Sequence, residues 1–315
     1  MSALSAPHFH NEEAAYAYVE ARIWPEGPVC PHCGGCERIS KMGGASTRIG
    51  TYKCYQCRKP FTVKVGTIFE ASHVAMRLWL QAMYLMAASK KGISSQQLHR
   101  TLGVTLKTAW FMSHRIRLAM ENGGDWTLGG EGKIVEADET YFGKTDDMRG
   151  VKPAKPNPKK KGRTKKNIRP IIALVERGGI AKVFHVKNAD KATVSALVMA
   201  NVHPDTRLHT DESRLYTGAD QVFATHETVR HIAKEYARGD VTTNTVEGFF
   251  SVFKRGMRGV YQHCSEKHLN RYVSEFGFRY NNRIALGVND LARADNLLSG
   301  VVGKRLTYRT AREQV

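Results

Sequence analysis

Four cysteines near the N-terminus form two pairs with the spacing of metal ligands. They are Cys30, Cys33, Cys54 and Cys57. Two residues separate the members of each pair, and 20 residues lie between Cys33 and Cys54. Such a turn presents two thiolates to one ion, and two turns complete the tetrahedral shell of Zn²⁺, so we predict a structural zinc site. Cys36 and His32 are alternative ligands, and buried cysteines without metal are the other interpretation.

Three acids further along the chain suit a second kind of metal chemistry. Asp138 stands inside an apolar segment, Asp211 follows another, and Glu247 begins a helical segment. Carboxylates are uncommon in or beside apolar runs unless they are paired or bind metal. Phosphodiester cleavage by two metal ions needs such carboxylates, brought together from separate parts of the chain. An all-oxygen site suits hard cations, so we expect Mg²⁺, or Mn²⁺, there.

Each of these acids has a competitor close by. Glu139 follows Asp138 and Glu212 follows Asp211. Side chains alternate between the two faces of a strand, so only one member of each pair can face the metal.

The composition points to a polyanionic partner. Lys and Arg number 48 against 29 Asp and Glu, a net charge of +19, and hydrophobic residues make up 42% of the 315 residues. The chain can therefore bury a core, and its excess charge favours nucleic acid. No apolar run reaches the ~18 residues of a membrane span, and the first residues do not resemble a secretory signal. We therefore expect a cytoplasmic protein with reduced thiols.

Changes in pattern divide the chain into three predicted domains. Residues 1–70 hold a short helix and the cysteine-rich, strand-forming segment. Residues 71–125 are helical in three pieces, interrupted at Gly92 and Gly103, and a Gly-rich linker follows. Residues 126–315 form the third domain.

The helical domain has the spacing of a helix-turn-helix. A short helix, a turn at Gly103 and a longer helix follow one another, and the longer helix carries Lys107, Arg115 and Arg117. In this motif the second helix enters the major groove, so we predict that these three residues contact DNA. The alternative is a small helical bundle with solvated charges.

Strands and helices alternate in the third domain. We expect three strands, a helix, two strands and closing helices over residues 131–285, which predicts a mixed sheet covered by helices, an α/β class. A Pro- and Lys-rich insert at 149–167 cannot pack into a core. We predict that its Lys159, Lys160 and Lys161 contact the DNA backbone; the alternative is a solvated loop.

Three segments together resemble a known family. They are 135–141 (VEADETY), 209–213 (HTDES) and 244–251 (NTVEGFFS), with Lys254 and Arg255 following. The chain resembles the DDE transposases of bacterial insertion sequences, in the zinc-ribbon subgroup (ISXO type). The 35 residues between Asp211 and Glu247 match the interval between the last two acids of that family. A basic residue is frequent in the family at the position of Lys254.

The resemblance implies an RNase H-like catalytic domain behind the zinc ribbon and the helix-turn-helix. Asp138, Asp211 and Glu247 would be the catalytic, metal-binding acids, and Lys254 and Arg255 would contact DNA phosphates. The implied reaction is metal-dependent cleavage at the element's ends, followed by attack of the freed 3′-hydroxyl on target DNA. DNA at the ends and at the target would be the partner. Pairing of two ends implies a homo-oligomer, acting at the bacterial nucleoid.

Two other functions fit the same residues. An RNase H-like nuclease would cut without joining. A catalytically inactive regulator would bind DNA through the ribbon and the helical domain alone.

Overall fold

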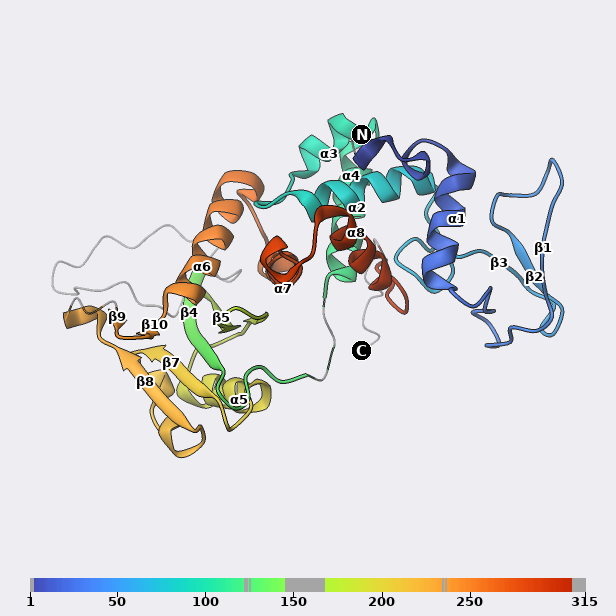
Figure 1. Cartoon of the computed structure of the whole chain (residues 1–315). Coiled ribbons are helices and arrows are strands. Elements are labelled where there is room, and N and C mark those ends of the chain that lie inside the picture. Colours follow the sequence, from blue (N-terminus) through green and yellow to red (C-terminus); the bar gives the residue numbers. More distant parts are fainter. Residues whose placement is uncertain are drawn as a thin grey trace, which may run out of the picture. The chain divides into compact units, whose positions relative to one another are not determined.

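The computed structural model of the protein describes residues 3–121, 124, 126–144, 168–233, 235 and 237–307. Two compact units make up the chain (Figure 1). Unit 1 is Met1–Asn122 with Gly287–Val315, and unit 2 is Gly123–Leu286. The predicted insert 149–167, with its three lysines, lies outside the described residues.

Unit 1 joins a small sheet to a group of helices. Its sheet has the order β1-β2-β3 and is antiparallel. Its principal elements are α1 (Glu12–Ile23), β1 (Ile39–Lys41), β2 (Tyr52–Cys54), β3 (Pro60–Phe61), α2 (Met76–Ala88), α3 (Ser95–Leu102), α4 (Leu106–Ala119) and α8 (Asp290–Ser299). Trp79, Leu98 and Ile116 are fully buried representatives of its helical core.

The three predicted helices of residues 71–125 are α2, α3 and α4. The Ser94 side chain caps α3 by accepting from the Gln97 N–H, and Thr105 caps α4 in the same way with Thr108. Between the two helices Gly103 has a φ of 67°, a left-handed conformation that glycine adopts without steric penalty. The turn of the predicted helix-turn-helix is therefore formed by the residues that the sequence indicated.

The C-terminal segment differs from the prediction. We assigned residues 126–315 to one domain, whereas Gly287–Val315 packs within unit 1. The reason is α8, whose Leu297 and Leu298 are buried and whose Arg293 Nη1 donates to the Ala87 carbonyl at the end of α2, at 3.2 Å. An apolar helix side needs a partner, and this one finds it on a helix some two hundred residues earlier.

Unit 2 is built on a five-stranded sheet of order β6-β5-β4-β7-β8. The pair β4–β5 and the pair β5–β6 are antiparallel, and β4–β7 and β7–β8 are parallel. The principal elements are β4 (Ile134–Lys144), β5 (Ile168–Glu176), β6 (Ala181–His185), α5 (Lys191–Asn201), β7 (Arg207–Asp211), β8 (Thr225–Val229), β9 (Ala237–Arg238), β10 (Val241–Thr242), α6 (Asn244–Gly256), a π-helical turn (Met257–Tyr261) and α7 (Glu266–Asn281). The predicted order of elements and the mixed α/β class are confirmed.

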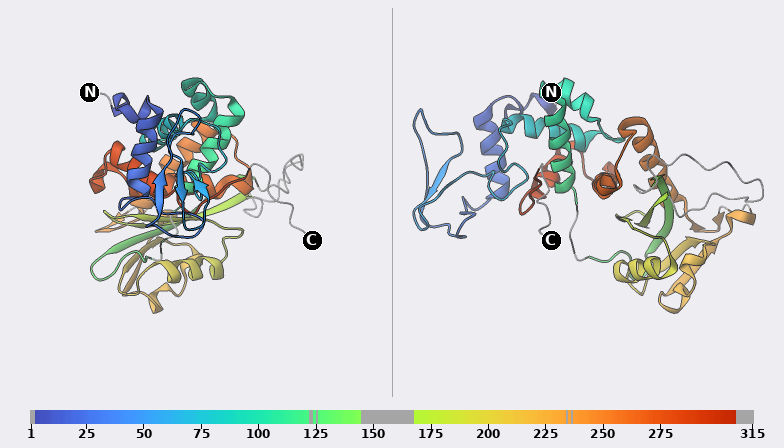
Figure 2. Two further views of the ribbon diagram at one scale, coloured as in Figure 1. Left: turned by 90° about the vertical axis from the view of Figure 1, so that its right-hand side faces the viewer. Right: turned by 180° about the vertical axis from the view of Figure 1, so that it is seen from behind.

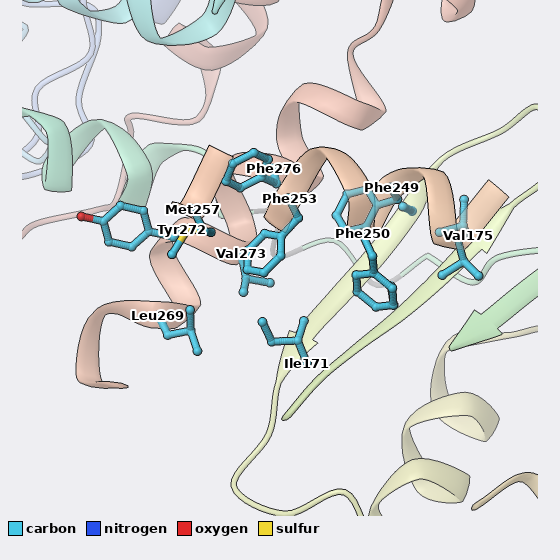
Figure 3. Close-up of a cluster of buried hydrophobic side chains, with 13 residues drawn as sticks. Ile171, Val175, Phe249, Phe250, Phe253, Met257, Leu269, Tyr272, Val273 and Phe276 are labelled. Carbon is cyan, nitrogen blue, oxygen red and sulfur yellow. The ribbon is translucent and has the colours of Figure 1, made fainter. Parts of the chain in front are cut away.

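Helices cover both faces of this sheet (Figure 2). On one face α5 packs its Val194 and Val198 against Ala137 of β4. On the other face α6 and α7 cover β5, through a cluster that Figure 3 shows around Phe250 and Phe253. Alternate residues of the central strands point to one helical layer or the other. The position of each acid along its strand therefore determines which helices its side chain faces.

Among the helices of the described residues, none combines the length and the apolar character that a membrane span needs.

Candidate active site and metal centre

The four predicted zinc ligands lie together. The Sγ atoms of Cys30, Cys33, Cys54 and Cys57 are all within 4.8 Å of one another. Cys30 Sγ lies 3.6 Å from Cys57 Sγ, and Cys33 Sγ lies 3.7 Å from Cys54 Sγ. Tetrahedral Zn²⁺ with Zn–S bonds of about 2.3 Å places its sulfur atoms at such separations. The cluster therefore fits a structural Zn²⁺, and the exposed Cys36 is not part of it.

The backbone around the second cysteine pair favours metal binding. Hydrogen bonds from the Cys57 and Gln56 N–H groups lower the pKa of the Cys54 thiol to about 7. A thiolate, not a thiol, is the zinc ligand, so these N–H groups stabilise the form that binds.

Asp138 and Asp211 face the same side of the central sheet. Glu136 of β4 is the register partner of His209 of β7 in the parallel pair. Residues two further along each strand point to the same face, and these residues are Asp138 and Asp211. This is the face that α6 covers, because the Val246 and Phe249 side chains of α6 pack over it. Glu247 lies between those two residues in the sequence.

Local hydrogen bonds hold two of the three carboxylates. Ser213 N donates to Asp211 Oδ1 at 3.0 Å, and Thr243 Oγ1 donates to Glu247 Oε1 at 3.0 Å. His231 Nε2 lies 3.4 Å from the same Glu247 oxygen. The Glu247 side chain is about half exposed, 47%, so it can still reach a ligand from solvent.

The pKa of Asp138 reflects the acids around it. The pKa of Asp138 is raised to about 8, first by burial and then by the negative charges of Glu139, Asp211 and Glu247. A carboxyl group in this position releases its proton readily only if a cation is present. The donor set therefore fits a hard divalent cation held by Asp138, Asp211 and Glu247.

The acids are more widely spread than the cysteines. Within the described part of the chain, only the cysteine cluster has three or more candidate ligand atoms that all lie within 4.8 Å of one another. The oxygens of Asp138, Asp211 and Glu247 are therefore not all within that distance of one another, and an N–H group holds one oxygen of Asp211 while a hydroxyl holds one of Glu247.

The face of the sheet distinguishes Asp138 from Glu139. Glu139 pairs in register with Ile172, which belongs to the core on the α5 side. There the buried Tyr216 hydroxyl donates to Glu139 Oε2 at 3.4 Å. Burial and the Glu139 charge raise the pKa of Tyr216 well above its usual value, so its hydroxyl remains a donor. Glu139 therefore has a partner on the opposite face from Asp211, which favours Asp138 as the metal ligand.

Sequence reasoning missed Glu136 and Arg177. The Glu136 side chain is fully buried, and Arg177 donates to its Oε1 from Nη2 at 2.8 Å and from Nε at 3.1 Å. The signal was present, because Glu136 is an acid inside an apolar strand in the same way as Asp138. Arg177 follows β5 and its partner could not be recognised from the sequence.

Two of the predicted DNA contacts are corrected by the structure. Arg115 is buried, and its Nη1 donates to the carbonyls of Ile68 and Glu70 at 2.7 and 2.9 Å. Arg117 is also buried, and its Nη1 donates to Ser113 Oγ at 2.9 Å. These guanidinium groups hold unit 1 together and are not available to DNA. The second half of α4 faces the interior of unit 1, although its basic residues suggested from the sequence that it is exposed.

The other predicted DNA-binding residues differ in exposure. Lys107, near the start of α4, is exposed. On α6, Arg255 is exposed and Lys254 is half-buried, with its Nζ 5.9 Å from the centre of the Phe250 ring.

Comparison with known proteins matches two stretches of the chain to transposase domains. Residues 127–281 match the ISXO2-like transposase domain, and residues 10–60 match the transposase zinc-ribbon domain. The chain therefore contains an ISXO2-like transposase domain preceded by a transposase zinc ribbon. The first match contains Asp138, Asp211 and Glu247, and the second contains all four zinc-ribbon cysteines. The RNase H-like fold and the zinc ribbon expected from the sequence are thereby confirmed.

This transposase also has a relative in another mobile element. It is 29% identical over 283 residues to a protein in transposable element ISH50 of Halobacterium salinarum, across 86% of this chain and 91% of the relative. Among solved structures, a chain of the complex of the simian T-cell lymphotropic virus intasome with the PP2A regulatory subunit B56 gamma is similar at 14% identity, with a TM-score of 0.28. That match covers 57% of this chain and 63% of the matched chain.

Proposed function

We propose that this transposase cleaves DNA at the ends of its insertion sequence and joins the freed 3′-hydroxyl to target DNA. Asp138, Asp211 and Glu247 are the proposed catalytic residues. The observation that carries the proposal is that Asp138 and Asp211 face the same side of the sheet, the side that α6, the helix of Glu247, covers. Three carboxylates from separate elements, β4, β7 and α6, suit a site for divalent cations.

Mg²⁺, or Mn²⁺, is the proposed cation, held by the oxygens of these three acids. When bound, such ions activate the attacking oxygen and stabilise the leaving oxygen of an in-line displacement. The protein's own part is to hold the carboxylates deprotonated and oriented. Ser213 N–H and Thr243 Oγ1 each bind one oxygen of Asp211 and Glu247, which leaves the other oxygen of each carboxylate for the cation.

Two exposed surfaces are proposed to bind DNA. On α6, the residues Glu247, Ser251 and Arg255 are exposed at helical spacing, and the exposed Arg258 follows in the π-helical turn, so basic side chains follow the acid along one side of the helix. DNA phosphates lying along this side would bring a scissile bond to Glu247. On α4, the exposed Lys107 lies in the first turn, the part of a recognition helix that reaches into the groove.

The proposed reaction has consequences for assembly. Two element ends must be held together for strand transfer, so we propose that the active form is a homo-oligomer. Acting on element and target DNA would place it at the nucleoid.

The test is a cleavage and strand-transfer assay on DNA that carries the element's ends. The zinc-loaded protein is assayed with Mg²⁺, without added Mg²⁺, and as Asp211→Asn. A matched control is Asp220→Asn, which makes the same change at an exposed acid of unit 2. We expect nicked and joined products from the wild type and the control with Mg²⁺, and no products from Asp211→Asn.

Other outcomes would support the competing functions. Metal-dependent cleavage without joining would indicate a nuclease. Tight DNA binding with no cleavage under Mg²⁺ or Mn²⁺ would indicate an inactive regulator.

A further inference from the structure

Glu136 is more completely bonded than any of the proposed catalytic acids. Its carboxylate accepts five hydrogen bonds and is fully buried. Arg177 donates two of them, to Oε1. The other three come from the first turn of α6: Thr245 N at 2.7 Å, Thr245 Oγ1 at 2.9 Å and Val246 N at 3.0 Å.

The first turn of α6 depends on this carboxylate. The residue before the helix, Thr243, makes no side-chain cap hydrogen bond. The N–H groups of a first turn have no partner within the helix and need one outside it. Glu136 provides it from β4, 109 positions away in the sequence from Thr245. Its negative charge also suits the positive end of the helix dipole.

Glu136 is linked to two of the proposed metal ligands, to one along its strand and to the other through its hydrogen bonds to α6. Asp138 is two residues further along β4, on the same face of the sheet. Glu247 directly follows Val246 on α6. The hydrogen bonds of Glu136 therefore connect the strand that carries one ligand to the helical turn that carries the other.

Arg177 makes the arrangement possible. It balances the buried charge of Glu136, and its Nη1 and Nη2 also donate to Asp240 O at 2.8 Å and to Thr242 Oγ1 at 3.1 Å. These acceptors lie at the turn and second strand of the β9–β10 hairpin, just before α6. A buried carboxylate without such a cation would be strongly destabilising.

We propose that Glu136 is a positioning residue, which sets the separation of Asp138 and Glu247 and thereby the affinity of the site for its divalent cation. This inference rests on the proposed function. In this proposal Glu136 does not bind the cation itself, because groups of the protein already donate all five hydrogen bonds that its carboxylate accepts.

Glu136→Gln is the informative substitution. The glutamine has nearly the same shape but presents an NH₂ group in place of one oxygen. Whichever way the amide is turned, that NH₂ faces a donor: either Arg177 or the N–H groups of Thr245 and Val246. The connection between β4 and α6 is therefore weakened without a cavity being formed.

The chain offers a matched control in Glu275→Gln. Glu275 is also fully buried and forms an ion pair with a buried arginine, Arg279, whose side chain is 6% exposed. Its partners lie on α7 and in the π-helical turn, since Tyr261 also donates to it. Both variants lose a buried charge in unit 2, but only Glu136→Gln affects the first turn of α6.

The experiment measures Mn²⁺ binding to the zinc-loaded protein by electron paramagnetic resonance, together with the Mg²⁺ concentration at half-maximal cleavage. For Glu136→Gln we expect the Mn²⁺ Kd and the Mg²⁺ midpoint to rise about 10-fold, the usual effect of losing a partner that orients metal ligands. The DNA Kd should change less than about 2-fold, because the basic side chains of the two DNA-binding surfaces, Lys107, Arg255 and Arg258, are left unchanged. Glu275→Gln should lower Tm similarly and leave the Mn²⁺ Kd unchanged.

A milder variant covers the case in which Glu136→Gln does not fold. Thr245→Val removes only the 2.9 Å hydroxyl hydrogen bond and leaves both backbone N–H bonds. We expect its Mn²⁺ Kd to rise about 3-fold. A wild-type Mn²⁺ Kd in the folded Glu136 variant, or in Thr245→Val if the former is unfolded, would overturn the inference, as would an equal shift in Glu275→Gln. A wild-type protein that binds no Mn²⁺ and does not cleave would overturn the proposed function itself, and the inference with it.

Discussion

Asp138 and Asp211 lie on the same face of the central sheet, on the neighbouring parallel strands β4 and β7. Glu136 of β4 pairs in register with His209 of β7, and Asp138 and Asp211 lie two residues beyond this pair on their respective strands. Two carboxylates in this relationship repel one another when no cation lies between them, and the raised pKa of Asp138 reflects this repulsion as well as burial.

The first prediction concerns the pH dependence of stability without Mg²⁺ or Mn²⁺. The folded-state pKa of Asp138, about 8, is above its unfolded value, so folding favours the protonated form. This stabilisation is complete below about pH 4 and is lost as the pH rises through about 8. Asp138→Asn avoids the loss. At pH 9 we expect it to raise the free energy of unfolding by about 1 kcal/mol or more, with little difference at pH 4.

Thermal denaturation of the zinc-loaded protein at both pH values measures this effect. Asp220→Asn, at an exposed acid, is the control and should change neither value. Equal stabilities of wild type and Asp138→Asn at pH 9 would show that the charge of Asp138 does not destabilise the folded protein.

The second prediction concerns Thr243. Its buried hydroxyl donates to Glu247 Oε1, so Thr243→Val leaves that oxygen free to turn. We expect the cleavage rate to fall about 10-fold, the effect of losing one hydrogen bond to a charged group, while the DNA Kd stays unchanged. Thr217→Val, at an exposed threonine, should retain the wild-type rate in the same assay. An unaltered rate in Thr243→Val would mean that Glu247 needs no such support.

The third prediction concerns the zinc site. We expect one zinc per chain by elemental analysis, lost in Cys54→Ser, with proteolytic cleavage appearing between residues 30 and 57 because four ligands are needed to hold the ribbon. Cys264→Ser, at a cysteine of unit 2 outside this cluster, is the matched control and should keep its zinc. Full zinc content in Cys54→Ser would point to a different ligand set.

The fourth prediction separates an exposed cation of α4 from a buried one. Lys107→Gln should weaken DNA binding and reduce the slope of log Kd against log salt concentration by about 1, as loss of one phosphate contact does. Arg115→Gln should lower Tm, because three carbonyls lose their donor, and leave the slope unchanged in the fraction that stays folded. A reduced slope in Arg115→Gln alone would reverse this assignment.

Much of this protein was predictable from the sequence because the signals are local. Ser94, Gly103 and Thr105 determine where the helices of the predicted helix-turn-helix begin and end, since caps and left-handed glycines act within one turn. The two cysteine pairs predict the zinc cluster for the same reason, because each pair already presents two ligands. The order of strands and helices in unit 2 follows from hydrophobic periodicity.

Other features were decided only by tertiary structure. The sequence could not show that Arg115 and Arg117 are buried, because a basic residue on a helix has the same local pattern whether it faces DNA or a set of carbonyls. Nor could it assign α8 to unit 1, since a helix has no local feature that names its packing partner.

The active-site acids separate what the sequence determines from what the tertiary structure determines. The apolar surroundings of Asp138, Asp211 and Glu247 indicated by themselves that these carboxylates need partners, but the same signal at Glu136 led to no role. Only the register of β4 with β7 and the approach of α6 place Asp138 with the other acids and Glu136 at a helix end. The physical reason is range: local propensity acts over a few residues, whereas a buried charge is stabilised by whichever groups the fold brings within about 3 Å.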